Sequence, residues 1–145
     1  MDGLDQGVDR WSKAAFRVFG ESFEPAEISG LLALEPTSSG RKGEVLSTSR
    51  LKRPLRNSAW ILTSPLKQSD PLQAHLHWLL DQLETKPDSV RAISRDYEAD
   101  LFCGFSSDSG QGGCTIGAGL LTRLGNLGVP LVLDFYPSGP IPDQE

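Results

Sequence analysis

Residues 70–85, DPLQAHLHWLLDQLET, predict an amphipathic helix around which the rest of the chain can be interpreted. Asp70 is a typical N-cap, Pro71 suits the first helical position, and Gln73 stands where a capping box places a glutamine or glutamate. The apolar positions repeat with the helical period; they are Leu72, Leu76, Leu79, Leu80 and Leu83. Leucines on one face predict that this face packs against a hydrophobic core.

Short apolar stretches on both sides of this helix predict strands. They are rich in β-branched and aromatic residues and are bounded by glycine or proline. The predicted strands lie at 14–19, 45–46, 58–63, 99–105 and 129–136. Two further helices are predicted, one from Pro25 to the residue before Pro36 and one at 120–127, which Gly128 can end in the left-handed conformation.

This order of elements predicts an α+β fold. The expected architecture is a ferredoxin-like mixed β-sheet with helices mainly on one face, extended by an α-β unit. A strand, a helix and a strand in succession close as a parallel crossover, so the last two strands are expected to run parallel. One domain is expected over residues 13–136, between flexible tails at 1–12 and 137–145 that carry few apolar residues.

The composition is that of an ordinary globular chain. The 145 residues are 38% hydrophobic with a net charge of −5, which disfavours disorder and fibrous folds. No apolar run has the roughly 18 residues of a membrane span, so no membrane partner is expected. The N-terminus lacks the basic and apolar regions of a secretory signal, which predicts a cytoplasmic protein. In that compartment Cys103 and Cys114 are expected to be reduced thiols.

Several short motifs follow one another in a distinctive order. They are Pro25-Ala26-Glu27-Ile28, Leu34-Glu35-Pro36-Thr37, Trp60 in a strand, the helix around Leu76, and Leu127-Gly128 before Leu133-Asp134-Phe135-Tyr136. In this order the chain resembles a bacterial family of uncharacterised proteins, domain of unknown function 4279, over about residues 13–136. The resemblance implies a small cytoplasmic bacterial α+β protein and supplies no catalytic residue.

Basic residues concentrate in the segment 41–56. Against one acidic residue, Glu44, the segment carries Arg41, Lys42, Arg50, Lys52, Arg53 and Arg56. One interpretation is a solvated hairpin whose charges keep the protein dispersed. The other is a patch that binds nucleic acid or another polyanion, although a net negative charge opposes such binding.

Trp78 lies almost opposite the leucine stripe when the helix is drawn with 100° per residue. An exposed tryptophan is a typical anchor of a protein interface, and His75 and Gln82 flank it. The alternative is that a tail or a loop covers the indole. The leading hypothesis is a non-enzymatic protein–protein interaction module, either antidote-like towards another protein or homodimeric.

The remaining candidates for chemistry are few. His75 and His77 are two residues apart on the predicted helix and cannot ligate one metal together, so neither a metal site nor a cofactor is predicted. No residue is assigned a catalytic role. A glycine loop precedes the helix at 120–127, and its amides could hold a phosphate through Gly110, Gly112, Gly113 and Thr115. Because this loop lacks a P-loop lysine, a phosphate-handling enzyme is the third hypothesis.

Overall fold

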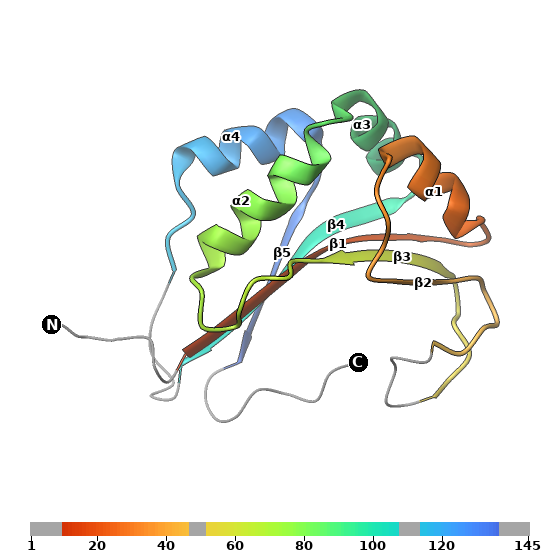
Figure 1. Cartoon of the computed structure of the whole chain (residues 1–145), viewed down its shortest axis with the longest axis horizontal. Helices are drawn as coiled ribbons and strands as arrows, with labels where there is room; N and C mark the ends of the chain where they lie inside the picture. The colour runs from red at the N-terminus through yellow and green to blue at the C-terminus, as the bar shows by residue number, and fades with distance from the viewer. Residues whose placement is uncertain (1–9, 47–51, 108–113, 137–145) are drawn as a thin grey trace, which may run out of the picture.

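The computed structural model describes residues 10–46, 52–107 and 114–136, which form one sheet and one layer of helices (Figure 1). The strands are β1 (Arg10–Gly20), β2 (Ser38–Gly40), β3 (Ser58–Thr63), β4 (Glu98–Ser107) and β5 (Leu131–Tyr136). The helices are α1 (Pro25–Leu32), α2 (Leu72–Leu83), α3 (Pro87–Asp96) and α4 (Ala118–Leu127).

The sheet has the strand order β2-β3-β1-β4-β5. β3 runs antiparallel to β1 and β2, and β4 runs antiparallel to β1, which is the arrangement of a ferredoxin-like sheet. β5 follows α4 and pairs parallel with β4, so it adds an α-β unit at the edge. The predicted α+β class, the ferredoxin-like core and the parallel last pair are all confirmed.

The core lies between the sheet and the helices, which cover one face of the sheet (Figure 1). Phe16 and Val18 of β1 point into it, and neither side chain is exposed. The five leucines of α2 are buried as well, which confirms the predicted stripe. Full burial of each leucine stabilises the fold by about 2 kcal/mol. Trp60 of β3 is also fully buried, as expected of a core tryptophan.

The start of α2 differs from the prediction. The helix begins at Leu72 with Pro71 as its N-cap, and no side chain caps it. Asp70 instead accepts a hydrogen bond from the Lys67 N–H at 3.0 Å, which closes the preceding turn. Gln73 accepts one from the Gly117 N–H at 2.7 Å. Both side chains therefore satisfy backbone donors outside the helix, and the prediction of a capping box is wrong.

Helix α3 was not predicted. Pro87 and Asp88 suit a first helical turn, but only Val90 and Ile93 are buried. Two apolar residues are too few to show a helical period in the sequence. Tertiary packing decides this helix, because it closes the end of the core between α1, α4 and β4.

Strand β2 is also displaced from its predicted position. It lies at Ser38–Gly40, where it pairs with β3, whereas Val45 makes only an isolated bridge with Pro54. The polar sequence of β2 carries no strand signal. The free edge of β3 supplies the pairing, so long-range hydrogen bonding overrides local preference here.

Candidate functional site

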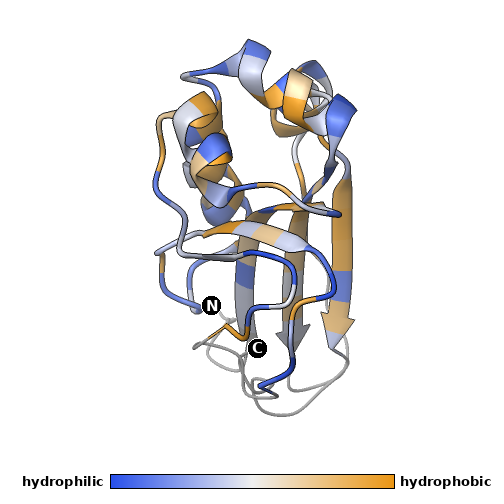
Figure 2. Ribbon diagram, turned by 90° about the vertical axis from the view of Figure 1, so that its right-hand side faces the viewer, coloured by the Kyte–Doolittle hydropathy of each residue, from blue (hydrophilic) through white to orange (hydrophobic). Residues whose placement is uncertain are grey.

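Strand β5 presents an apolar edge. Among the described strands it pairs only with β4, and its side chains of Val132, Leu133 and Phe135 are 36%, 51% and 41% exposed. Figure 2 shows the strand coloured as hydrophobic over most of its length. Native sheets normally protect such an edge with charges, prolines or a covering element, and β5 carries one charged residue, Asp134, and no proline.

The direction of the backbone groups on β5 follows from one hydrogen bond. The carbonyl of Pro130 accepts the Leu101 N–H at 2.9 Å and therefore points towards β4. Because successive residues alternate along a strand, the N–H and C=O groups of Leu131, Leu133 and Phe135 point away from the sheet. The same three side chains lie on the helix-bearing face, where α4 packs on α2 and α3 and leaves β5 largely uncovered.

On the face of the sheet that no described helix covers, Arg17 and Asp100 form an ion pair. Arg17 donates two hydrogen bonds of 2.8 Å to the Asp100 carboxylate. The guanidinium also lies 4.3 Å from the ring centre of Phe102 and 5.2 Å from that of Phe19. The bidentate pair and the two rings satisfy this arginine internally, so it stabilises the sheet and is not a free charge for a ligand.

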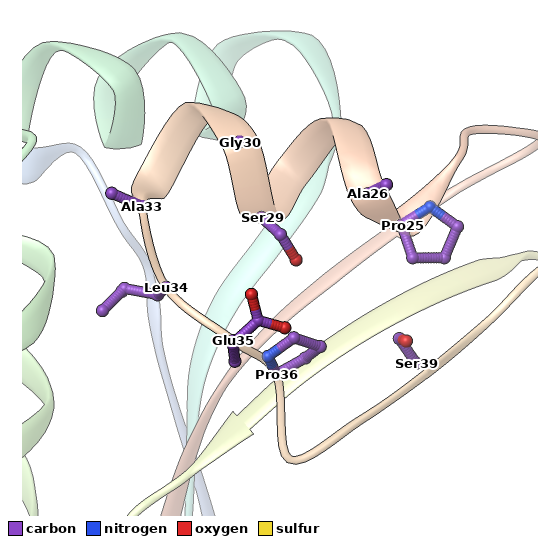
Figure 3. A pocket seen from close by; sticks show the side chains of 9 residues that line it. All are labelled: Pro25, Ala26, Ser29, Gly30, Ala33, Leu34, Glu35, Pro36 and Ser39. Atoms are coloured by element: carbon purple, nitrogen blue, oxygen red, sulfur yellow. The ribbon is translucent and has the colours of Figure 1, made fainter.

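An open pocket of about 710 Å³ lies beside α1 (Figure 3). Its walls come from both ends of α1, from the segment that follows it and from β2. The lining residues are Pro25, Ala26, Ser29, Gly30, Ala33, Leu34, Glu35, Pro36 and Ser39. Two of the motifs that carry the family resemblance, at 25–28 and 34–37, therefore meet in space around one cavity.

The polar groups of this pocket come from α1 and the turn after it. Ala33 has a left-handed φ of 56°, which ends α1 and turns the chain back along the helix. As a result the Glu35 carboxylate and the Ser29 hydroxyl point towards one another (Figure 3). The Ser29 oxygen accepts a 3.0 Å hydrogen bond from the indole N–H of Trp60, which fixes its position against the core.

The three residues of the interface predicted on α2 are less exposed than expected. His75 is only 1% exposed, so its expected place beside an exposed Trp78 is wrong. Trp78 is half-buried and packs against the core, and Gln82 is half-buried too. The reason is that α4 lies along α2 and that the loop before α2 encloses His75, so apolar surface extends further around the helix than the leucine stripe.

His75 belongs to a buried polar pair. Its Nδ1 lies 2.8 Å from the Ser64 hydroxyl, and Ser64 also accepts the Leu66 N–H at 3.3 Å. The other ring nitrogen, Nε2, has no hydrogen-bond partner in the part of the chain that the structure describes. Burial lowers the pKa of His75 below its ordinary value of 6.5, and the carbonyls of Lys67 and Asp70 and the Asp70 charge oppose this only in part. A buried, uncharged histidine acts here as a structural group.

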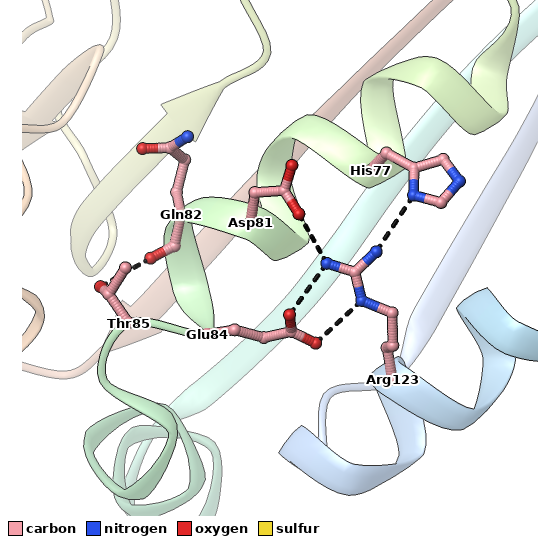
Figure 4. Close-up of polar contacts among 6 residues, drawn as sticks. All are labelled: His77, Asp81, Gln82, Glu84, Thr85 and Arg123. Carbon is pink, nitrogen blue, oxygen red and sulfur yellow. Dashed lines mark hydrogen bonds and ion pairs between the residues drawn. The ribbon is translucent and has the colours of Figure 1, made fainter.

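On the outer side of α2, Arg123 of α4 gathers three partners (Figure 4). It donates to Glu84 through two atoms at 2.9 Å and to Asp81 at 2.7 Å. Its third nitrogen lies 3.0 Å from Nδ1 of the exposed His77, which must accept because a guanidinium only donates. The hydrogen bonds to Glu84 and Asp81 raise the pKa of Arg123 above its ordinary value. The guanidinium therefore stays charged, and the cluster connects α2 to α4.

One cation of the predicted basic patch, Arg41, is already paired with acidic residues. Arg41 lies 3.4 Å from Glu24 and 3.7 Å from Glu44, and its own backbone N–H donates to Glu44. The exposed cations of the segment among the described residues also include Lys42, Lys52, Arg53 and Arg56. Arg50 lies outside the described residues, so the patch as a whole stays a prediction.

The glycine loop cannot be compared with the structure, because Gly110, Gly112 and Gly113 lie outside the described residues. Thr115 is described and exposed. The Gly117 amide just before α4 already donates to Gln73. Phosphate binding at this loop therefore stays a prediction.

The two cysteines are both free and differ in exposure. Cys103 is buried in the core, and burial raises the pKa of its thiol to about 12. Cys114 is exposed, and partial burial raises the pKa of its thiol as well. Neither thiol has the lowered pKa of a reactive cysteine.

Within the described chain, no three side chains of the metal-ligating types gather at one place. None of its helices combines the length and the apolar character needed to cross a bilayer.

The fold and its surfaces define a small α+β protein with a ferredoxin-like core, helices on one face and an exposed apolar edge strand. The chain matches the family described as Domain of unknown function (DUF4279) over residues 10–138, and it belongs to this family. The resemblance inferred from the motifs is thereby confirmed. No curated protein and no solved structure matches the chain.

Two features were not singled out from the sequence. The edge position of β5 could have been inferred, since a strand added parallel to β4 must end the sheet once β1 occupies the other side of β4. The pocket beside α1 left no comparable signal. Glu35 reaches it only because Ala33 turns the chain and β2 docks on β3.

Proposed function

We propose that this protein is a non-enzymatic interaction module of the bacterial cytoplasm that forms a homodimer by pairing β5 with β5 of a second copy. The observation that carries the proposal is the apolar edge of β5, on which Leu133 and Phe135 are exposed beside backbone groups that pair with no described strand. Addition of a strand to such an edge is a common mode of protein recognition.

The sequence of β5 is compatible with antiparallel self-pairing about a twofold axis through Leu133. In this register Leu133 lies opposite its own copy, and Leu131 lies opposite Phe135. These are the residues whose N–H and C=O groups point outwards, so up to about six backbone hydrogen bonds can form. Their apolar side chains share one face, and cross-strand apolar pairs would cover Leu133 and Phe135 from both sides.

Charge supports the same register. Asp134 is the only charged residue of β5, and this register places it opposite Val132 of the second copy, not opposite the other Asp134. The net charge of −5 on each chain still opposes association. A strand of six residues buries less than the roughly 800 Å² per partner of a standard interface, so we expect a dissociation constant of about 10–100 μM.

Sedimentation equilibrium of two variants tests the proposal. Leu133→Lys places like charges at the twofold axis, and we expect it to be monomeric at about 200 μM, where the unmodified chain dimerises. Leu121→Lys is the matched control, because Leu121 is also 51% exposed but lies on α4. It should dimerise like the unmodified chain, and circular dichroism should show that both variants are folded.

A chain that remains monomeric up to about 1 mM would refute the homodimer. Equal weakening by Leu133→Lys and Leu121→Lys would also refute the assignment to β5. A purified foreign protein that binds one chain through Leu133 while the chain alone stays monomeric would replace the second copy as the occupant of the edge.

Nucleic-acid binding through the basic segment is the alternative. It draws on the exposed Lys42, Arg53 and Arg56, but Arg41 is already paired with acidic neighbours. The third hypothesis, a phosphate-handling enzyme, depends on the glycine loop outside the described residues. The homodimer has the stronger support because it draws on described backbone and side-chain geometry.

A further inference from the structure

We propose that the pocket between α1 and β2 binds an alkylammonium group, with Glu35 as its counter-ion. The group could belong to a lysine side chain of a peptide or to a free polyamine, because both present the same ammonium on an aliphatic stem. The inference is independent of the homodimer, since no residue of β5 lines this pocket.

The size and the walls of the pocket suit such a group. Its volume of about 710 Å³ falls within the roughly 300–1,000 Å³ typical of ligand sites. Pro25, Leu34 and Pro36 supply apolar surface for an aliphatic stem. The pocket is open to solvent on one side, so a chain longer than the cavity can enter at one end.

The charge of the pocket favours a cation. Among the described residues that line it, Glu35 alone is charged, and it makes no hydrogen bond or ion pair with any other described residue. Both ends of α1 line the cavity, Pro25 and Ala26 at its start and Ala33 at its end, so the helix dipole leaves the sign of the charge to Glu35.

Hydroxyl groups complete the set of acceptors. The Ser29 oxygen is held by the indole N–H of Trp60 and keeps a second lone pair. Ser39 of β2 lines the opposite wall. An ammonium group has three donors and no acceptor, so one carboxylate and two hydroxyls match its hydrogen-bonding needs.

A divalent metal ion fits this pocket less well. Calcium takes six to eight oxygen ligands and magnesium needs near-octahedral geometry, whereas the pocket offers one carboxylate. An anion fits worst, since none of the described residues that line the cavity is a lysine, arginine or histidine. The apolar walls and the single negative charge together point to an organic cation.

Titration of the ¹⁵N-labelled chain, followed by NMR, tests the inference. The probes are 1,4-diaminobutane, a peptide with one lysine and blocked ends, and 1,4-butanediol as the neutral control. The reporter is the indole N–H resonance of Trp60, because it donates to Ser29 at the pocket wall. The indole resonance of Trp78, on α2, serves as the internal reference. We expect saturable shifts of the Trp60 resonance with the two amines and none with the diol.

Three variants assign the site. Glu35→Gln removes the charge and should weaken amine binding about tenfold, the usual effect of losing one charge-assisted hydrogen bond. Glu27→Gln is the matched control, because Glu27 is an exposed carboxylate of α1 that does not line the pocket, and it should change binding less than twofold. Gly30→Leu should fill the cavity and abolish binding. A Cβ at Gly30 meets no atom within 4 Å, so this variant should fold.

Equal binding of the diol, equal weakening by Glu35→Gln and Glu27→Gln, or no shift with about 20 mM amine would each overturn the inference. Undiminished amine binding by a folded Gly30→Leu variant would overturn it too. If the inference holds, tighter binding of the peptide assigns the pocket to a protein lysine, and tighter binding of the diamine assigns it to free polyamines.

Discussion

At the scale of single residues, burial decides which side chains are available for function. His75 and Trp78 differ by three positions on α2, yet the first is enclosed beside Ser64 and the second is half-buried at the margin of the core. Glu35 stands in the opposite situation, because it is exposed and has no partner among the described residues.

Lowering the pH should destabilise the protein through His75. Its pKa in the folded state lies below 6.5, so the unfolded chain takes up a proton first as the pH falls through 6.5. The stability contributed by the neutral ring is therefore present above pH 6.5 and lost below it, by at most about 1.4 kcal/mol per pH unit. Urea unfolding at about pH 7.5 and 5.5 should show this loss. His75→Gln should remove the slope, whereas His77→Gln should keep it; an unchanged slope in His75→Gln would contradict the assignment.

Trp78→Ala should lower the free energy of unfolding by about 2 kcal/mol. The indole packs against the core, so its removal leaves a partial cavity and loses apolar burial. Urea denaturation measures the effect as a lower midpoint at similar slope. A loss below about 0.5 kcal/mol would instead indicate a free, exposed tryptophan.

At the scale of elements, the last helix and the last strand behave as an appended unit. α4 is held to α2 by the Arg123 cluster and by buried leucines, and Gly128 ends it with a left-handed φ of 71°. Of the strands that the structure describes, β5 pairs with β4 alone, and it receives little cover from α4. The helices thus cover the ferredoxin-like core, whereas apolar side chains of the appended strand β5 are exposed.

Arg123→Ala should lower stability by about 1 kcal/mol. Three acceptors share one partly exposed guanidinium, and such networks contribute more than isolated surface pairs. Arg95→Ala is the matched control, because Arg95 pairs only with the adjacent, exposed Asp96 and should have almost no effect. Thermal unfolding of both variants measures the difference, and equal melting temperatures would show that the cluster contributes nothing.

Amide hydrogen exchange should alternate along β5. In the dilute monomer the N–H groups of Leu131, Leu133 and Phe135 point outwards and should exchange fast, while those of Val132 and Asp134 are bonded to β4 and should be protected. At about 200 μM, pairing of β5 should slow the first set selectively. Uniform protection in the dilute protein would contradict the assigned direction of the strand.

At the scale of the whole molecule, the net charge of −5 is unevenly spread. Basic residues concentrate between β2 and β3, and the remainder of the chain is acidic. A homodimer formed through an apolar edge should respond weakly to salt. Binding of a polyanion by the basic segment should respond strongly.

Salt should therefore separate the two functions. Raising NaCl from about 50 to 200 mM should leave the dimer dissociation constant unchanged within about threefold, because the paired strands contain one charge each. Fluorescence anisotropy with a single-stranded oligonucleotide should show no binding at 200 mM. Binding at 50 mM that weakens more than about tenfold at 200 mM, and is lost in Arg53→Glu, would favour the nucleic-acid hypothesis.

The sequence by itself determined the core, the ferredoxin-like class of the sheet and the parallel pairing of its last two strands. The leucines of α2, the alternation at Phe16 and Val18, and the α-β-unit at the end specify which faces are apolar, and apolar faces have few ways to pack. The tertiary structure alone decided α3, β2, the burial of His75 and the pocket at Glu35. Each of these depends on contacts between distant segments, such as Gln73 with Gly117 or Ser29 with Trp60, which no local pattern encodes.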